Sequence, residues 1–296
     1  MSGTPPRVRR LFADVGGPVH YADFGGEGRP IVLVHGLGGA HLNWLSVAPA
    51  LASLGRVLAL DLAGHGRTPS LGRAPVGANR RLLDGFLRAV AGGPAVLVGN
   101  SMGGYLALAE AAAAPERVSA LVLVNPAVPL ARGAPLDAAV AAMLAGLTLP
   151  LVGEALMLAR WRRGPEWSVR SLLALCCVDP SRVAPEVLAA HVALAEERHG
   201  LKRVAARDFL AAQRSLMGRL VRRRRFFRMV AGIAAPALIV QGDRDRLVRI
   251  AAARALAVAR PDWRLEVLDR IGHVPMLEDP ERYLALVTPW IDAHSA

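Results

Sequence analysis

The sequence predicts an α/β fold in which helices cover a mostly parallel sheet, with a helical segment inserted between two strands. Three observations lead to this prediction. Short apolar runs alternate with helical patterns along most of the 296 residues, which is typical of parallel sheets covered by helices. The alternation stops between Val128 and Ile233, where only helical patterns occur. Polar residues directly follow several of the apolar runs, as they do where a site forms at the carboxyl edge of such a sheet.

The strands are expected in a simple order along the chain. Residues 8–15 and 18–24 carry polar residues beside apolar ones and fit an antiparallel pair at the edge of the sheet. Six further apolar runs fit the remaining strands, which we place at residues 30–36, 56–62, 95–100, 118–126, 236–243 and 264–269. With 53% hydrophobic residues, the chain can bury one substantial core and still supply an insertion. We therefore expect an α/β core of residues 1–128 and 233–296 and a helical cap of residues 129–232.

Composition limits the partners and the compartment. The formal net charge is +12, but most arginines are scattered, so we expect no nucleic-acid partner. One cluster, residues 222–225, is four arginines followed by Phe226 and Phe227; it fits either a solvated face of an amphipathic helix or a peripheral contact with an anionic membrane. The two cysteines, Cys176 and Cys177, are neighbours and predict two buried or unreactive thiols without a disulfide. The first twenty residues lack an apolar segment of signal-peptide length, so we expect a cytoplasmic protein.

One serine stands in the context of a nucleophile elbow. The stretch "AVLVGNSMGGYLA", residues 95–107, runs from an apolar strand through Gly99 and Ser101 into a helical pattern that ends before Pro115. A serine on a sharp turn between a buried strand and a helix is the structural context that such a nucleophile requires. The glycines around it leave space for a strained turn and for close packing of the helix on the sheet. We therefore expect Ser101 to be a nucleophile.

Other candidate residues follow the other strands. His35 follows the run at 31–34, Asp61 the run at 57–60, Asp245 the run at 237–240, and His273 the run at 264–269. Parallel strands of an open α/β sheet bring such residues to one edge. A serine nucleophile needs a base that takes its proton, an acid that orients the base, and backbone donors for the oxyanion. The residue types required for acyl transfer are therefore expected at a single site.

The chain resembles the α/β-hydrolase fold serine hydrolases over nearly its whole length. The resemblance rests on "HGLGG", "DLAGHGRT", "GNSMGG", "GDRDRLV" and "GHVPMLEDPERY", which occur in the family's order. The order Ser101, Asp245, His273 is also the triad order of that fold. The resemblance implies a serine hydrolase with these three catalytic residues.

The individual roles rest on different observations. His273 is expected to be the base, since the other seven histidines lie in glycine-rich turns or lack a place after a strand. Asp243 and Asp245 both follow the same strand and either could reach an imidazole, but the family spacing favours Asp245. Asn125 stands where some hydrolases of this fold carry their acid. Asp61 and Asp279 read as turn-forming or capping residues.

The oxyanion donors are expected to be backbone amides. Met102 follows the nucleophile, and Leu37 lies in the loop after the earlier strand, which are the two positions that the fold uses. His35 is expected to brace that loop. Hydrolysis through Ser101 needs no metal or organic cofactor, and no metal-spaced cluster of His and Cys occurs in the sequence. We therefore expect no cofactor.

The substrate is expected to be a small apolar ester, thioester or lactone. Residues 138–153, "AAVAAMLAGLTLPLVG", carry no charge and are too short and too interrupted by proline to span a bilayer. They fit either a cap helix packed on the core or the lining of an apolar cleft, together with Met157, Trp161 and Trp167. The sequence does not predict an oligomeric state.

Two alternatives to the esterase hypothesis remain. The "GNSMGG" elbow is also similar to that of hydrolases that cleave carbon–carbon bonds in ring-fission products of aromatic compounds. Two features depart from that group: the oxyanion loop reads "HGLGG" in place of glycine-proline-glycine, and Val274 replaces the tryptophan that often follows the catalytic histidine. The second alternative is a catalytically slow ligand-binding sensor of the same fold.

Overall fold

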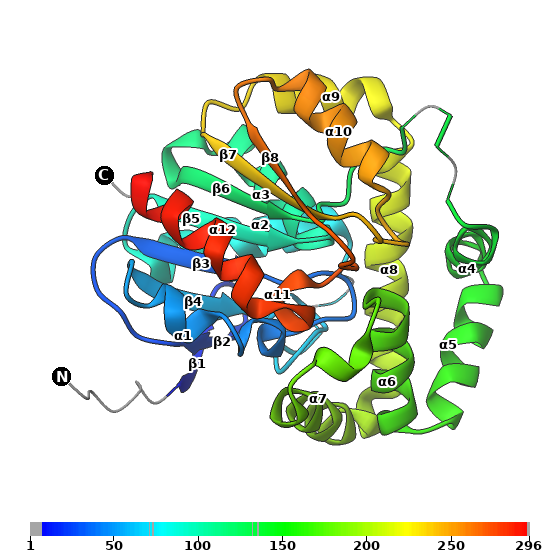
Figure 1. Cartoon of the computed structure of the whole chain (residues 1–296). Helices are drawn as coiled ribbons and strands as arrows, with labels where there is room; N and C mark the ends of the chain where they lie inside the picture. Colours follow the sequence, from blue (N-terminus) through cyan, green and yellow to red (C-terminus); the bar gives the residue numbers. More distant parts are fainter. Residues whose placement is uncertain (1–7, 71, 73, 132, 135, 295–296) are drawn as a thin grey trace.

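The computed structural model describes residues 8–70, 72, 74–131, 133–134 and 136–294. Its centre is an eight-stranded sheet with the order β1-β2-β4-β3-β5-β6-β7-β8 (Figure 1). The strands are β1 (Arg9–Asp14), β2 (Pro18–Asp23), β3 (Pro30–Val34), β4 (Arg56–Leu60), β5 (Ala95–Asn100), β6 (Val118–Val124), β7 (Ala237–Gly242) and β8 (Arg264–Leu268). Each expected strand is present, with bounds that differ by a few residues at its ends.

The pairing confirms the predicted mixture of strand directions. β1 pairs with β2 and β2 with β4 in antiparallel fashion, whereas every pair from β4 to β8 is parallel. β5 lies between β3 and β6, with Val98 opposite Leu33 on one side and opposite Val122 on the other. The residue after β5 therefore emerges near the middle of the sheet, where neighbouring strands deliver other residues to the same edge.

Successive residues of the central strands enter two different cores. On β5, Leu97 packs into the cluster that contains α3, whereas Val96 and Val98 pack into the cluster on the opposite face. Side chains alternate between the faces of a strand, so an all-apolar strand requires cover on both sides. The covering helices are α1 (Ala48–Leu51), α2 (Val76–Phe86), α3 (Met102–Ala113), α10 (Ile250–Ala259), α11 (Pro275–Glu278) and α12 (Pro280–Ala293). Short 3-10 or π turns form at His41–Trp44, Leu87–Ala91, Pro115–Arg117, Pro180–Arg182 and His199–Leu201.

The described part of the segment between β6 and β7 consists of helices and the loops that connect them. It contains α4 (Ala138–Thr148), α5 (Val152–Arg162), α6 (Pro165–Cys176), α7 (Pro185–Glu197), α8 (Lys202–Leu220) and α9 (Arg223–Ala231). Proline is the first residue of α6 and of α7, where its missing N–H costs no hydrogen bond. Figure 1 shows α4 to α8 standing together beside the sheet, with α8 nearer to it than α4 and α5. Within the described residues no single helix is long and apolar enough to cross a membrane; α4 and α5 meet that test only as a pair, and they are bent by 110°.

The arginine cluster at 222–225 lies at the start of α9. Phe226 and Val230 are buried in the same core cluster as α3, whereas Arg222, Arg224 and Arg225 are exposed. The helix therefore has one face on the core and one in solvent, as in the amphipathic-helix reading of the sequence. A contact of this face with an anionic membrane stays a prediction.

Candidate active site

Ser101 occupies the sharp turn between β5 and α3. Its backbone has φ 55° and ψ −117°, a conformation that residues with a side chain rarely adopt and that often marks functional sites. The turn requires glycine nearby. A Cβ on Gly103 would lie 2.1 Å from the carbonyl oxygen of Val34, and a Cβ on Gly99 would lie 2.5 Å from the Gly103 carbonyl. The glycines of the motif therefore let α3 approach the sheet closely enough to hold the serine in this strained position.

The imidazole of His273 is held by a carboxylate. Its Nδ1 lies 2.7 Å from Oδ2 of Asp245, and both side chains are almost completely buried. The other carboxylate oxygen, Oδ1, accepts the backbone N–H groups of Leu247 and Val248 at 2.8 and 2.9 Å. These bonds orient the carboxylate, and an ionised carboxylate fixes the proton of the imidazole on Nδ1. Nε2 is then the nitrogen that is free to accept a proton.

Asp243, the competing acid, has a different environment. Its Oδ1 accepts the Ile271 amide at 3.3 Å, and its Oδ2 lies 3.5 Å from the exposed Arg244 side chain. The structure therefore places Asp245 beside His273, whereas Asp243 lies in the turn that directly follows β7. Family spacing favoured the same residue.

Asn125 is a supporting residue whose role sequence reasoning missed. Its Nδ2 donates to Asp245 Oδ2 at 2.7 Å and to the carbonyl of Gly272 at 2.8 Å, while its Oδ1 accepts the Gly242 amide at 3.1 Å. It adopts a φ of 45°, which asparagine tolerates better than most residues. Asn125 thus ties Asp245 to the loop that carries His273. The signal was an asparagine directly after a central strand.

The backbone of His273 is fixed on both sides. Its N–H donates to the carbonyl oxygen of Cys176 at 2.5 Å, and its carbonyl oxygen accepts Nδ2 of Asn100 at 3.0 Å. Cys176 is the last residue of α6 and is buried, and burial raises the pKa of its thiol to about 12. It therefore stays a neutral thiol and acts here through its backbone.

Glu278 joins the histidine loop to the end of α6. One carboxylate oxygen accepts the amides of Val178 and Asp179 at 2.8 and 2.9 Å, and the other accepts the amide of Gly272 at 2.8 Å. The residue is 1% exposed, and a buried carboxylate is stable when hydrogen bonds satisfy it in this way. The loop before the histidine is consequently bonded to the inserted helices as well as to the sheet.

Ser101 and His273 line one cavity of about 630 Å³ between the sheet edge and the inserted helices. In the part of the chain that the structure describes, no hydrogen bond joins the Ser101 hydroxyl to the imidazole; such bonds are often long without substrate. Leu37 lines the same cavity, and its amide has no acceptor among the described residues. Met102 is the first residue of α3, so its amide also lacks an acceptor within the helix.

His35 has both ring nitrogens occupied. Nδ1 lies 2.7 Å from the carbonyl oxygen of Gly36, and Nε2 accepts the Leu62 amide at 3.0 Å. Complete burial lowers its pKa to about 3. A neutral imidazole that bridges the two loops has no nitrogen left for substrate, which fits the expected bracing role.

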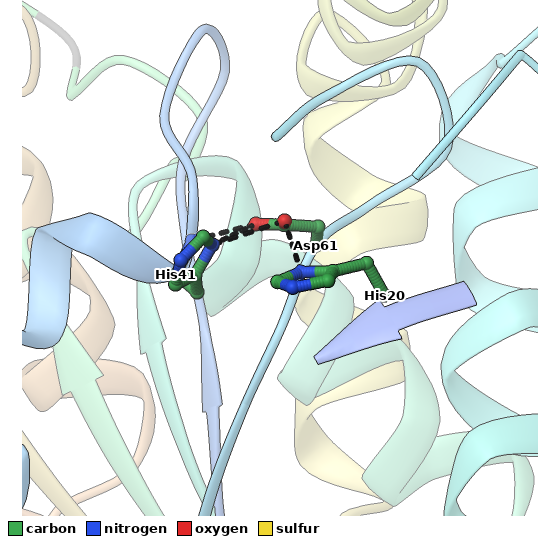
Figure 2. Close-up of side chains that lie close together, drawn as sticks. All are labelled: His20, His41 and Asp61. Atoms are coloured by element: carbon green, nitrogen blue, oxygen red, sulfur yellow. Dashed lines mark hydrogen bonds and ion pairs between the residues drawn. The ribbon is translucent and has the colours of Figure 1, made fainter. Parts of the chain in front are cut away.

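A second polar cluster lies outside the cavity. Figure 2 shows His20 and His41 on either side of Asp61, with Nδ1 of each imidazole 2.7 and 3.0 Å from Asp61 Oδ2. Asp61 also accepts the backbone N–H groups of His41 and Arg67. Burial alone would raise the pKa of Asp61, but the hydrogen bonds from the two histidines hold it below its usual range. The carboxylate therefore stays ionised.

The same three side chains are the group that could hold a metal ion, since their ligand atoms lie within 4.8 Å of one another. The carboxylate, however, already accepts N–H groups from two imidazoles and two backbone amides. Neither Nε2 has a partner in the described structure, whereas a metal-bound imidazole usually donates its second N–H. The arrangement fits a hydrogen-bonded cluster that fixes the turn after β4.

Similarity to known proteins extends over most of the chain. A model of the alpha/beta hydrolase family matches residues 31–286. A monoacylglycerol lipase of Mycolicibacterium smegmatis is 31% identical and covers 97% of this chain and 98% of its own length. A 2-hydroxy-6-oxononadienedioate/2-hydroxy-6-oxononatrienedioate hydrolase of Burkholderia vietnamiensis is 30% identical, with coverage of 92% and 90%.

Other similarities are to a larger protein and to a solved structure. The acetyltransferase component of an acetoin cleaving system from Pseudomonas putida is 32% identical; the match covers 91% of this chain but 66% of that protein. The crystal structure of a bacterial membrane phospholipase A superposes with a TM-score of 0.73 at 28% identity, covering 97% of this chain and 86% of that one. With the family model spanning most of the chain, the protein belongs to the alpha/beta hydrolase family.

Proposed function

We propose that this protein is a serine hydrolase that cleaves carboxylic esters of apolar acyl groups through an acyl-enzyme. Ser101 is the nucleophile, His273 the general base and Asp245 the acid that orients it. The observation that carries the proposal is that a strained serine and a histidine held by a carboxylate line the same cavity. This is the combination of residues that acyl transfer requires.

The proposed reaction has two halves. His273 Nε2 takes the hydroxyl proton of Ser101 while the oxygen attacks the ester carbonyl, and the imidazolium that forms is stabilised by Asp245. The tetrahedral intermediate then expels the alcohol, which receives the proton from Nε2. In the second half a water molecule gives a proton to His273 Nε2 and attacks the acyl-enzyme; the tetrahedral intermediate then releases the carboxylic acid, and Nε2 returns the proton to the Ser101 oxygen.

The amides of Leu37 and Met102 are the proposed donors to the oxyanion. Support comes from three observations: Met102 directly follows Ser101, Leu37 lines the same cavity as Ser101, and neither amide has an acceptor among the described residues. A Cβ on Gly36 would lie 2.9 Å from the Cβ of Ser101, so the loop that carries Leu37 approaches the serine closely. Donors fixed in this way stabilise charge that develops in the transition state.

The proposed substrate class follows from the cavity. Its lining is rich in aliphatic and aromatic side chains, and its volume of about 630 Å³ is within the range of small-molecule sites. The lining residues of this kind on the inserted helices include Met143, Leu144, Leu147, Met157, Trp161, Leu172, Phe209 and Leu216. In this proposal residues 129–232 act as a cap over a core of residues 1–128 and 233–296. The monoacylglycerol lipase among the relatives supports an acyl ester.

Carbon–carbon bond hydrolysis is the second candidate. It is favoured by the Burkholderia vietnamiensis relative, which is 30% identical over 281 residues, and it would use the same three side chains. A ring-fission dienoate assayed beside p-nitrophenyl esters distinguishes the two. Faster turnover of the dienoate would replace the ester proposal.

Active-site labelling tests the nucleophile directly. We expect a fluorophosphonate probe to label Ser101 alone, and Ser101→Ala to lose both labelling and turnover. Ser171→Ala is the matched control, because Ser171 lies on α6 and its hydroxyl donates to the Ser168 carbonyl; this variant should label normally. Labelling that persists in Ser101→Ala, or that maps to Ser46 or Ser171, would contradict the assignment.

A further inference from the structure

The charged groups that line the cavity all have the same sign. Four cationic side chains contribute to the wall, Arg160, Arg198, Lys202 and Arg223, and no Asp or Glu is among the described residues that line it. A concave surface lined by one sign of charge raises the local concentration of ligands of the opposite sign. The cavity therefore favours an anionic ligand although most of its wall is apolar.

Three of these cations contact other groups of the protein or lie in solvent. Arg198 donates through its two terminal nitrogens to the carbonyls of Gly66 and Gly64. Arg223 donates to the carbonyl of Leu130 at 2.9 Å and lies over the ring of Phe227. Lys202 is exposed at the start of α8. Their contribution to the cavity is a general positive potential.

Arg160 differs from the other three. Its Nη2 donates to the carbonyl of Ser168 at 2.6 Å, and among the described residues no carboxylate lies within ion-pair distance. Burial lowers its pKa, but a guanidinium keeps its proton in proteins. Arg160 is partly exposed and lines the cavity, and no carboxylate among the described residues compensates its charge. An anion in the cavity would compensate it.

The position of Arg160 relates it to the catalytic residues. It bonds to Ser168 near the start of α6, and the same helix lines the cavity with Val169, Leu172, Leu173 and Cys176. Cys176, at the other end, accepts the amide of His273. Cys176 follows Ser168 by eight positions, which is about 12 Å along the helix. An apolar wall therefore separates the unpaired guanidinium from the reacting groups.

We propose that the preferred substrates are esters whose acyl chain ends in a carboxylate or a phosphate, and that Arg160 binds that terminal anion. The apolar wall of α6 contacts the chain between the two ends. A guanidinium pairs with either anion through two parallel hydrogen bonds, so the chemistry common to both is an anionic oxygen group. This inference rests on the proposed ester hydrolysis at Ser101.

The test compares p-nitrophenyl esters of matched chain length that end in a methyl group, a carboxylate or a phosphate. We expect Arg160→Gln to lower kcat/KM on the charged esters by on the order of tenfold or more, mainly through KM, because a charge-assisted hydrogen bond is lost. Methyl-terminated esters should be unaffected. Arg160→Lys should keep part of the preference, and the carboxylate and phosphate series show which anion is bound better.

Arg163→Gln is the matched control, since Arg163 lies just beyond the end of α5, is exposed and rests on Trp167; its profile should equal that of the wild type. In the wild type, added salt should raise KM for the charged esters alone, which keeps the test valid if Arg160→Gln does not fold. Equal effects of Arg160→Gln on charged and neutral esters, or charged KM values that do not respond to salt, would overturn the inference while ester hydrolysis stands. A wild-type protein that hydrolyses no ester of any series would overturn both.

Discussion

The two carboxylate oxygens of Asp245 bind different groups: one accepts backbone amides, and the other contacts side chains. Oδ1 accepts two backbone amides, and Oδ2 meets His273 and Asn125. An amide side chain at this position would present an N–H to one of these sets of donors. The carboxylate is therefore matched to its surroundings in a way that Asp243, with a single long hydrogen bond from Ile271, is not.

Asp245→Asn should lower turnover by on the order of 10⁴, because a triad histidine without its carboxylate adopts the wrong tautomer and orientation. Asp243→Asn should lower it far less. The measurement is kcat on a p-nitrophenyl ester, with near-UV circular dichroism as the control for folding. The opposite order of the two variants would assign the acid to Asp243.

Sequence reasoning narrowed the acid to two residues and could not separate them by residue type alone. Both aspartates follow β7, and the choice depends on how the turn after the strand packs against the loop before His273. Asn125, which directly follows β6, takes part in that packing through its hydrogen bonds with Gly242 and Gly272. Contacts among three segments that are distant in sequence leave no local pattern. The sequence therefore showed only that Asn125 stands where some hydrolases of this fold carry their acid.

At the scale of elements, a buried carboxyl group on α3 contacts a partly exposed arginine on α2. Glu110 of α3 is 0% exposed and lies 2.8 Å from Arg80 of α2. Burial raises the pKa of Glu110 to about 7, although Arg80 opposes the shift. The folded protein thus holds a proton on this carboxyl group at a pH where the unfolded chain has released it.

This raised pKa predicts a pH dependence of stability. From its ordinary pKa up to about 7 the native state binds more protons at this site than the unfolded state, so the free energy of unfolding falls as pH rises through that window. Glu110→Gln should remove this contribution and flatten the profile. The measurement is Tm from pH 4 to pH 8 for both proteins, and parallel profiles would contradict the prediction. Glu116→Gln, at an exposed neighbouring site, is the control.

The elements were the part of the fold that sequence predicted best. Strand–helix alternation depends on local apolar periodicity, and the strands lie where that periodicity predicts them. The helices between β6 and β7 were expected only as a group. Their arrangement over the sheet edge depends on long-range contacts such as Arg214 of α8 with Glu154 of α5, which no local pattern encodes.

At the scale of the whole molecule, the cavity joins the sheet edge to the inserted helices and predicts a chain-length preference. Each buried methylene contributes about 0.8 kcal/mol, so kcat/KM should rise from acetate towards medium-chain esters until the cavity is full. Leu144 and Leu147 of α4 line it, and Leu144→Asp or Leu147→Asp should flatten the rise. Ala142→Asp, on the exposed side of α4, should leave it unchanged. A flat or falling profile in the wild type would show that the cavity suits a small or polar substrate.

The hydrogen bonds between the end of α6 and the loop that carries His273 also limit where the helices between β6 and β7 can be replaced by those of another protein. Four hydrogen bonds form there, since Glu278 accepts the Val178, Asp179 and Gly272 amides while the Cys176 carbonyl accepts the His273 amide. A foreign set of helices grafted between β6 and β7 would remove the segment from Cys176 to Asp179 and leave the buried Glu278 short of two donors. A chimaera that is meant to gain a new specificity must therefore retain this four-residue segment in its native place, so the useful crossover points lie within the inserted region and not at its two ends.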